Sequence, residues 1–169
     1  MVNLKLIETE TSDGFKLHGC FLEPQSSNFS DIDALLLVHG TTGNFYSGSM
    51  LSILGKYFSK NGYPVAVFNT RGHDVVSQGR SNLHSDFGGT AFEILNDCLF
   101  DLDSMINWLR DQGFNNICLI GSSMGAVKVT YYQAIRNNFL VRLVVAISPV
   151  RLSKNYYLNS EALFHYKKY

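Results

Sequence analysis

Four short runs of apolar residues, spread along the chain, most restrict the folds that this sequence can adopt. They cover residues 34–38, 63–69, 116–120 and 141–148. The first, ALLLV, shows no alternation between apolar and polar side chains, which is typical of a parallel strand covered on both faces. The chain therefore needs helices on both sides of such a sheet.

The segments around these runs supply the remaining elements. Apolar residues recur at intervals of three or four over 49–60, over about 92–113 and over 124–137, which predicts three helices. Residues 2–10 and 15–23 are rich in strand-forming residues and are separated by a Ser-Asp-Gly turn, which predicts a hairpin. We predict an α/β fold, a three-layer α/β/α sandwich whose mostly parallel sheet of about six strands begins with an antiparallel hairpin.

Length, charge and hydropathy bound the domain organisation, the partners and the location of the chain. The 169 residues fit one domain, which we place at 1–150, with 151–169 as a tail or the start of a lid-like segment. The 14 basic and 14 acidic residues cancel without forming long blocks, so we expect no nucleic-acid partner. No apolar run is long enough for a signal-peptide core or a membrane span, so we expect a cytoplasmic protein.

The three cysteines, Cys20, Cys98 and Cys118, are odd in number and widely spaced. Their spacing fits neither a zinc site nor a disulfide framework, and we interpret them as small buried apolar side chains. No metal site and no organic cofactor are predicted.

A candidate nucleophile lies in the sequence GSSMG at 121–125, between a predicted strand and a predicted helix. A tight strand-to-helix turn needs glycine where a Cβ would collide, and it exposes its middle serine, Ser123, at the end of the sheet. A merely structural turn is the alternative. The backbone N–H of Met124, at the start of the helix, would face a developing oxyanion. The glycine-rich loop HGTTG at 39–43 would supply a second donor, the N–H of Thr41.

Three motifs follow successive predicted strands: HGTTG at 39–43, TRGH at 70–73 and GSSMG at 121–125. In this order they resemble the α/β-hydrolases, especially the serine-aminopeptidase and monoacylglycerol-lipase-like branch. The resemblance implies hydrolysis of an ester, thioester or small amide through an acyl-enzyme on Ser123, with a small acyl substrate. It makes His39, Gly40 and His73 candidate substrate contacts.

The resemblance covers nearly all of this chain but only about the first six of the family's eight strands. In that family the catalytic Asp and His follow the serine, after a seventh and an eighth strand, and neither strand is found here. We therefore expect a truncated α/β-hydrolase fold with an incomplete catalytic triad. The histidines of the sequence are interpreted as loop or surface residues rather than as a general base: His18, His39, His73, His84 and His165.

Two interpretations of function remain open. In the first, the chain is a serine hydrolase whose Asp and His come from a continuation or a separate C-terminal polypeptide, or from an oligomer, docked on the exposed edge of the sixth strand. In the second, it is a non-catalytic truncated hydrolase or a binding module.

Charged residues outside the motifs are given structural roles. Arg71 and Asp74 are expected to fix their loop through hydrogen bonds rather than to contact a substrate. The aspartates at 97, 101 and 103 are expected on the polar side of the second predicted helix, as solvated charges.

Overall fold

The N-terminal hairpin forms where the sequence predicts it. In the computed structural model, which describes residues 3–24, 26, 31–79 and 87–151, strand β1 (Asn3–Glu10) pairs antiparallel with β2 (Lys16–Glu23). Gly14 has a positive φ of 85° in the turn, a conformation that glycine adopts without steric cost. The N–H of Thr11 donates to the carbonyl of Phe15 at 2.9 Å and closes the turn.

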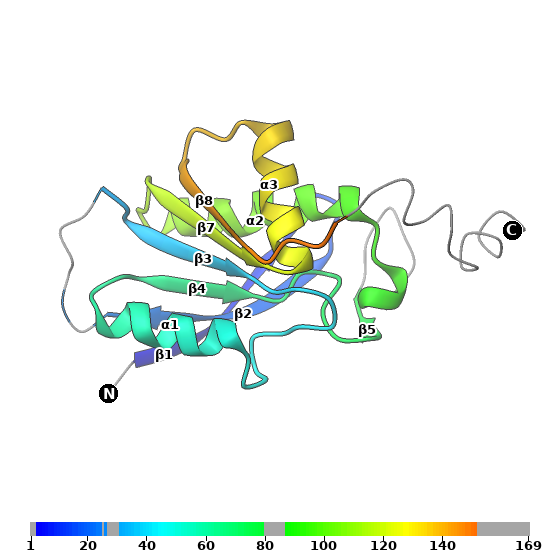
Figure 1. Cartoon of the computed structure of the whole chain (residues 1–169), viewed down its shortest axis with the longest axis horizontal. Coiled ribbons are helices and arrows are strands. Elements are labelled where there is room, and N and C mark those ends of the chain that lie inside the picture. The colour runs from blue at the N-terminus through cyan, green and yellow to red at the C-terminus, as the bar shows by residue number, and fades with distance from the viewer. Residues whose placement is uncertain (1–2, 25, 27–30, 80–86, 152–169) are drawn as a thin grey trace, which may run out of the picture.

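Four further strands extend the hairpin into a six-stranded sheet: β3 (Ala34–Val38), β4 (Val65–Phe68), β7 (Ile117–Ser122) and β8 (Val141–Ile147). The strand order is β1-β2-β4-β3-β7-β8, and β4, β3, β7 and β8 are parallel. Every residue of β3 and β4 is buried, which accounts for their unbroken apolar sequences. The parallel strands end at one common edge of the sheet (Figure 1).

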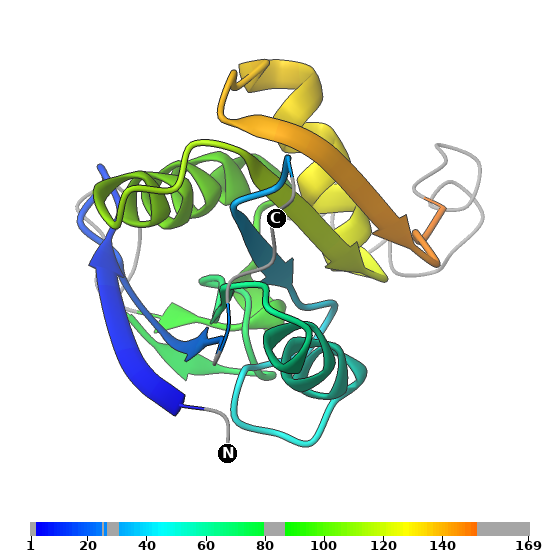
Figure 2. The same ribbon diagram turned by 90° about the vertical axis from the view of Figure 1, so that its left-hand side faces the viewer.

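Three helices complete the layers. Helix α1 (Met50–Lys60) covers one face of the sheet, whereas α2 (Cys98–Asp111) and α3 (Met124–Arg136) cover the other (Figure 2). Alternate residues of β3 serve the two cores: Leu35 lies in the cluster beneath α1, and Leu36 lies in the cluster beneath α2 and α3. The predicted three-layer α/β/α sandwich with a mostly parallel sheet and an antiparallel hairpin is confirmed.

The second predicted helix is shorter than its sequence period suggests. Helix α2 begins at Cys98, and two short 3-10 turns precede it, at Thr90–Phe92 and Leu95–Asp97. Between them Glu93 and Ile94 have extended backbones with ψ angles of 126° and 124°. The prediction of a helix from about residue 92 was wrong because a buried ion pair of Glu93, described below, holds this segment outside the helix.

The last strand of the sheet is partly exposed. Strand β8 lies at an edge of the sheet, as predicted. Leu143 on β8 is 49% exposed because α1 packs over β2, β3 and β4 instead.

A small second sheet, β5 (Ser77–Gln78) with β6 (Phe87–Gly88), was not predicted. The predicted tail or lid-like segment at 151–169 lies outside the described residues except for Arg151.

The three cysteines were predicted to be small buried side chains, and no membrane span was predicted. All three cysteines are free and buried, as predicted, and burial raises the pKa of Cys20 and Cys118 to about 11 and that of Cys98 to about 12. None of the helices in the described ranges is long and apolar enough to cross a bilayer.

Candidate active site

Ser123 occupies a strained turn between β7 and α3. Its backbone has φ 55° and ψ −120°, a region that residues other than glycine rarely adopt. The flanking glycines make the turn possible. A Cβ at Gly121 would lie 2.2 Å from the carbonyl oxygen of Gly125, and one at Gly125 would lie 2.2 Å from the carbonyl oxygen of Val38. The N–H of Ser123 donates to the carbonyl of Ile147 on β8 at 2.9 Å.

The loop after β3 faces this serine. A Cβ added at Gly40 would lie 2.9 Å from Ser123 Cβ and 3.4 Å from Ser123 Oγ. The following residue, Thr41, is exposed, and neither its N–H nor that of Met124 donates to a backbone group of the described residues. Met124 lies in the first turn of α3, where backbone N–H groups have no acceptor within the helix. Gly40, the residue before Thr41, lies beside the hydroxyl of Ser123.

His39 fixes the base of this loop. Its ring is buried and its Nε2 accepts the N–H of Thr70 at 2.9 Å. Nδ1 therefore carries the proton and donates to the carbonyl of Gly40 at 2.8 Å. Burial, and next the nearby charge of Lys128, lower the pKa of His39 to about 3, so the ring is neutral at physiological pH.

A buried lysine supports the same loop from below. Lys128 on α3 has no exposed surface, forms an ion pair with Glu93, and donates to Thr70 Oγ1 at 3.0 Å. Together with the bonds of His39, this pair forms a continuous polar chain from Glu93 to the Gly40 carbonyl. The sequence interpretation missed Lys128 and Glu93.

A signal for this lysine is present in the sequence. On α3 the buried side runs through Gly125, Val129 and Tyr132, and Lys128 falls between them at helical spacing. A lysine on the apolar stripe of a helix needs a buried partner.

His73 and Asp74 lie in the loop after β4. The Asp74 carboxylate accepts hydrogen bonds from His73 Nδ1 at 2.9 Å, from Asn44 Nδ2 at 2.6 Å and from the hydroxyl of Tyr46. Burial alone would raise the pKa of Asp74, but the bonds from Tyr46, His73 and Asn44 outweigh it and lower the pKa. The bond to Asp74 raises the pKa of Tyr46 to about 12. Asp74 thus joins the loops after β3 and β4, as predicted for a loop-fixing residue.

Arg71 fixes the same loop from inside, which confirms the sequence prediction. Its guanidinium contacts Asp13 and Asp101, each at 2.8 Å, and lies 3.6 Å from Asp97. Burial opposes its charge, but these carboxylates outweigh burial and raise the pKa of Arg71. The interpretation of Asp97 and Asp101 as solvated charges was wrong, because both are buried against this guanidinium; Asp103 is half-buried and pairs with Arg136 at 2.8 Å.

The other predicted residues are distributed as follows. His18 is exposed on β2 and lies 3.0 Å from Glu8, whereas His84 and His165 lie outside the described residues. The described part of the chain contains no cluster of three or more His, Cys, Asp or Glu side chains that could hold a metal ion.

Strained residues gather at the edge where the parallel strands end. Thr42, Asp74, Ser123 and Ser148 follow β3, β4, β7 and β8, and each has a positive φ between 47° and 57°. The chain leaves β3 toward β4 on one side and later places β7 on the other, so the position between the loops after β3 and β7 is a topological switch point. Ligand sites of open α/β sheets occur at such points, and strain concentrates at functional sites.

Comparisons with known proteins agree with this fold. The family described as alpha/beta hydrolase fold matches residues 33–165, and no curated protein matches the sequence. An esterase of Pyrococcus furiosus is similar in structure, with a TM-score of 0.69 and 22% identity over 99% of this chain and 61% of its own. The α/β hydrolase GrgF of a Penicillium species has a TM-score of 0.70 and 17% identity, over 96% of this chain and 53% of its own.

A third similar structure is Est1E of Butyrivibrio proteoclasticus with ferulic acid bound, which has a TM-score of 0.62 and 17% identity over 83% of this chain and 52% of its own. At these identities the likeness concerns the fold. This chain spans about three fifths of the length of the Pyrococcus esterase.

Proposed function

The chain belongs to the α/β-hydrolase fold family, and we propose that it is a serine hydrolase that cleaves carboxylic ester, thioester or small amide bonds through an acyl-enzyme on Ser123. The observation that carries the proposal is the strained backbone of Ser123, whose side chain faces Gly40 at the topological switch point. Assignment to the serine-aminopeptidase and monoacylglycerol-lipase-like branch is part of the proposal and rests on the three motifs alone.

In this mechanism Ser123 Oγ attacks the carbonyl carbon of the substrate and transfers its proton to a base. The carbonyl oxygen becomes an oxyanion, which the N–H groups of Thr41 and Met124 stabilise. Collapse of the intermediate breaks the bond to the leaving group, which takes the proton from the base and departs. Water then hydrolyses the ester on Ser123 by the same steps in reverse order.

We propose that the base is supplied from outside the described residues. Among the described residues no hydrogen bond joins Ser123 Oγ to His18, His39 or His73, and both ring nitrogens of His39 are already bonded within the loop. We assign the base and its orienting carboxylate to polypeptide outside the described residues, docked at the free edge of β8 as a continuation, a complementing chain or an oligomer partner. His73 and Gly40 remain proposed substrate contacts, and His39 positions the loop.

The loop after β4 supports an apolar acyl group. Val75, Val76, Phe87 and Phe92 are each more than half exposed there. This segment is joined to the predicted oxyanion loop, since the N–H of Thr42 donates to Thr90 Oγ1 at 2.9 Å. Exposed apolar side chains beside a site favour an apolar ligand.

The second candidate function is that of a non-catalytic binding module that keeps the fold. The observation in its favour is that none of the three described histidines forms a hydrogen bond with Ser123 Oγ. The two functions differ in the reactivity of the serine, because loss of the base lowers the rate of such a triad by roughly six orders of magnitude.

A fluorophosphonate probe tests the proposal directly. The full chain is incubated with the probe, alone and with any polypeptide encoded next to it, and labelling is mapped by mass spectrometry of peptides. We expect a label on Ser123 that is lost in Ser123→Ala and retained in the matched control Ser122→Ala. No label on Ser123 under any of these conditions would favour the binding module.

A further inference from the structure

A second hollow lies on the α1 face of the sheet, apart from Ser123. It has a volume of about 310 Å³, and neither the GSSMG turn nor the loop at 39–43 lines it. Ligand pockets in proteins have volumes of about 300–1,000 Å³, and a dry apolar cavity of about 150 Å³ holds benzene. The hollow therefore has room for a molecule larger than a six-carbon ring.

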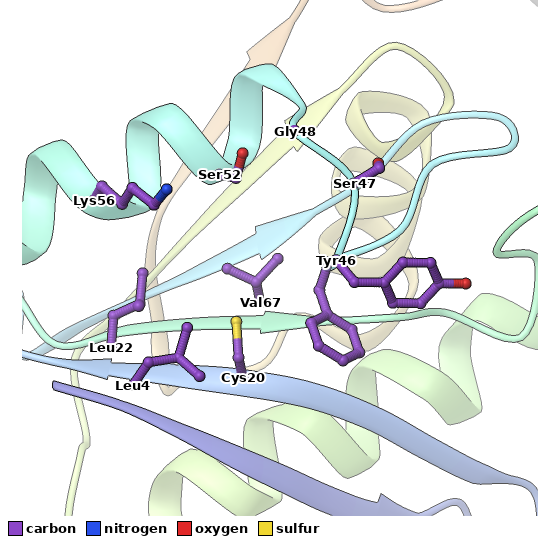
Figure 3. Close-up of a pocket in the computed structure, with 10 residues that line it drawn as sticks. Leu4, Cys20, Leu22, Tyr46, Ser47, Gly48, Ser52, Lys56 and Val67 are labelled. Carbon is purple, nitrogen blue, oxygen red and sulfur yellow. The ribbon is translucent and has the colours of Figure 1, made fainter. Parts of the chain in front are cut away.

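The floor of this pocket is made by three neighbouring strands. Leu4 of β1 pairs with Leu22 of β2, and Cys20 of β2 pairs with Val67 of β4. Because alternate residues of a strand share a face, these four side chains all rise toward α1 (Figure 3). Burial keeps the thiol of Cys20 neutral, as its pKa is raised to about 11, so the floor is apolar.

The hollow exists because α1 does not cover β1. The helix packs tightly on β2 at Gly55, where an added Cβ would lie 3.0 Å from Leu22 Cδ1. On β1 the same face stays open: Leu4 is 51% and Leu6 is 76% exposed. The space between helix and edge strand is closed at one end by the segment from Phe45 to Gly48.

One charge lines the pocket. Lys56, one turn after Ser52 on α1, is its only cation, and no acidic residue is among the ten that line it. The hydroxyl of Ser52 donates to the carbonyl of Ser49 at 2.7 Å, so the donor left for an anion on this side is the Lys56 ammonium group. Lys56 has no carboxylate partner within the described ranges.

We propose that this pocket binds a medium-chain carboxylate, with the alkyl chain on the floor of Leu4, Leu22 and Val67 and the carboxylate against Lys56. An apolar floor beside one cation that has no carboxylate partner among the described residues matches an amphipathic anion, because the chain leaves water while the charge stays at the surface. The site is separate from the proposed acyl-enzyme and does not depend on it.

The test is a titration of the full ¹⁵N-labelled chain with sodium octanoate, followed by amide chemical shifts. Octanoate is expected to shift amides at Cys20, Gly48, Lys56 and Val67, and butyrate to bind about 100-fold more weakly, since four methylenes are lost from the floor. 1-Octanol, which has no charge, is expected to bind about fivefold to tenfold more weakly than octanoate.

Two variants at residues of α1 that line the pocket probe the site. Lys56→Glu is expected to weaken octanoate at least fivefold, and Ser52→Phe to abolish its shifts by filling the hollow. Lys60→Glu, on the same helix but outside the pocket, is the matched control and should leave octanoate affinity unchanged.

Several results would overturn the proposal. They are octanoate shifts confined to residues 40–43 and 121–125, equal binding of octanol and octanoate, or equal losses in Lys56→Glu and Lys60→Glu. Pocket amides that shift with protein concentration alone would overturn it too, because the occupant would then be a second copy of the chain. Fluorophosphonate labelling of Ser123 is scored separately, so failure of one proposal leaves the other standing.

Discussion

Replacing either member of the Glu93–Lys128 ion pair by methionine should destabilise the protein strongly. Lys128 has no exposed side-chain surface and Glu93 has 9%. Truncating one partner of a buried pair leaves an uncompensated charge and costs about 3–5 kcal/mol. For a domain of this size, such a loss lowers the melting temperature by roughly 6–20 °C.

The double variant Glu93→Met/Lys128→Met should recover most of this loss. Both charges are then absent, and two apolar side chains of similar length fill the space, which is often neutral or stabilising. We expect the double variant to lie within about 2 kcal/mol of the parent chain. The singles and the double form a cycle whose coupling energy measures the pair itself.

Urea unfolding followed by tryptophan fluorescence provides the measurement. The single tryptophan, Trp108, packs edge-on against Phe21 at 5.4 Å and Phe68 at 5.8 Å, so its emission reports on the core. The matched control is Lys5→Met, which removes the exposed pair with Glu23 and should change the midpoint little. Single variants that cost less than about 1 kcal/mol each, or a double variant whose loss is their sum, would refute the reasoning.

Three further predictions concern the loops around Ser123. The pKa of His39 rises from about 3 in the folded chain to about 6.5 when unfolded, so its stabilising contribution is complete above pH 6.5 and is lost as pH falls toward 3. Urea titrations at pH 7 and pH 5 should differ by about 2 kcal/mol from this group, a difference absent in His39→Gln. Gly40→Ala should lower the rate of fluorophosphonate labelling of Ser123 at least tenfold, because its methyl group would lie 2.9 Å from Ser123 Cβ. The control Gly48→Ala, where a methyl group meets nothing within 4 Å, should leave the labelling rate of Ser123 unchanged. Arg71→Met should cost about 3–5 kcal/mol in urea unfolding by leaving buried carboxylates unpaired, and a loss below about 1 kcal/mol would contradict that account.

The elements and the serine turn could be predicted because their signals are local. Strand β3 is buried on both faces, and its five consecutive apolar residues predict this burial. The turn at Ser123 needs glycines on either side, and both stand in the sequence within two residues of it. Patterns of this kind require no knowledge of distant contacts.

The buried charges could not be predicted in the same way. Asp101 lies on a helix that also carries exposed polar residues, and only the approach of Arg71, 30 positions earlier, makes it an interior residue. The late start of α2 has the same origin, since Glu93 is drawn to Lys128. A single sequence records charges but not the segments that come to neutralise them.

The hydrogen bond from Ser123 N–H to the Ile147 carbonyl joins the proposed nucleophile to the outermost described strand. The backbone of Ser123 is held in its uncommon conformation partly by β8, whose other edge has no strand partner in the described part of the chain. We therefore expect strand addition at that edge and presentation of the serine to be thermodynamically linked. A polypeptide that pairs with β8 would gain affinity when Ser123 is held in place, and a ligand that holds Ser123 would in turn favour the pairing by the same factor.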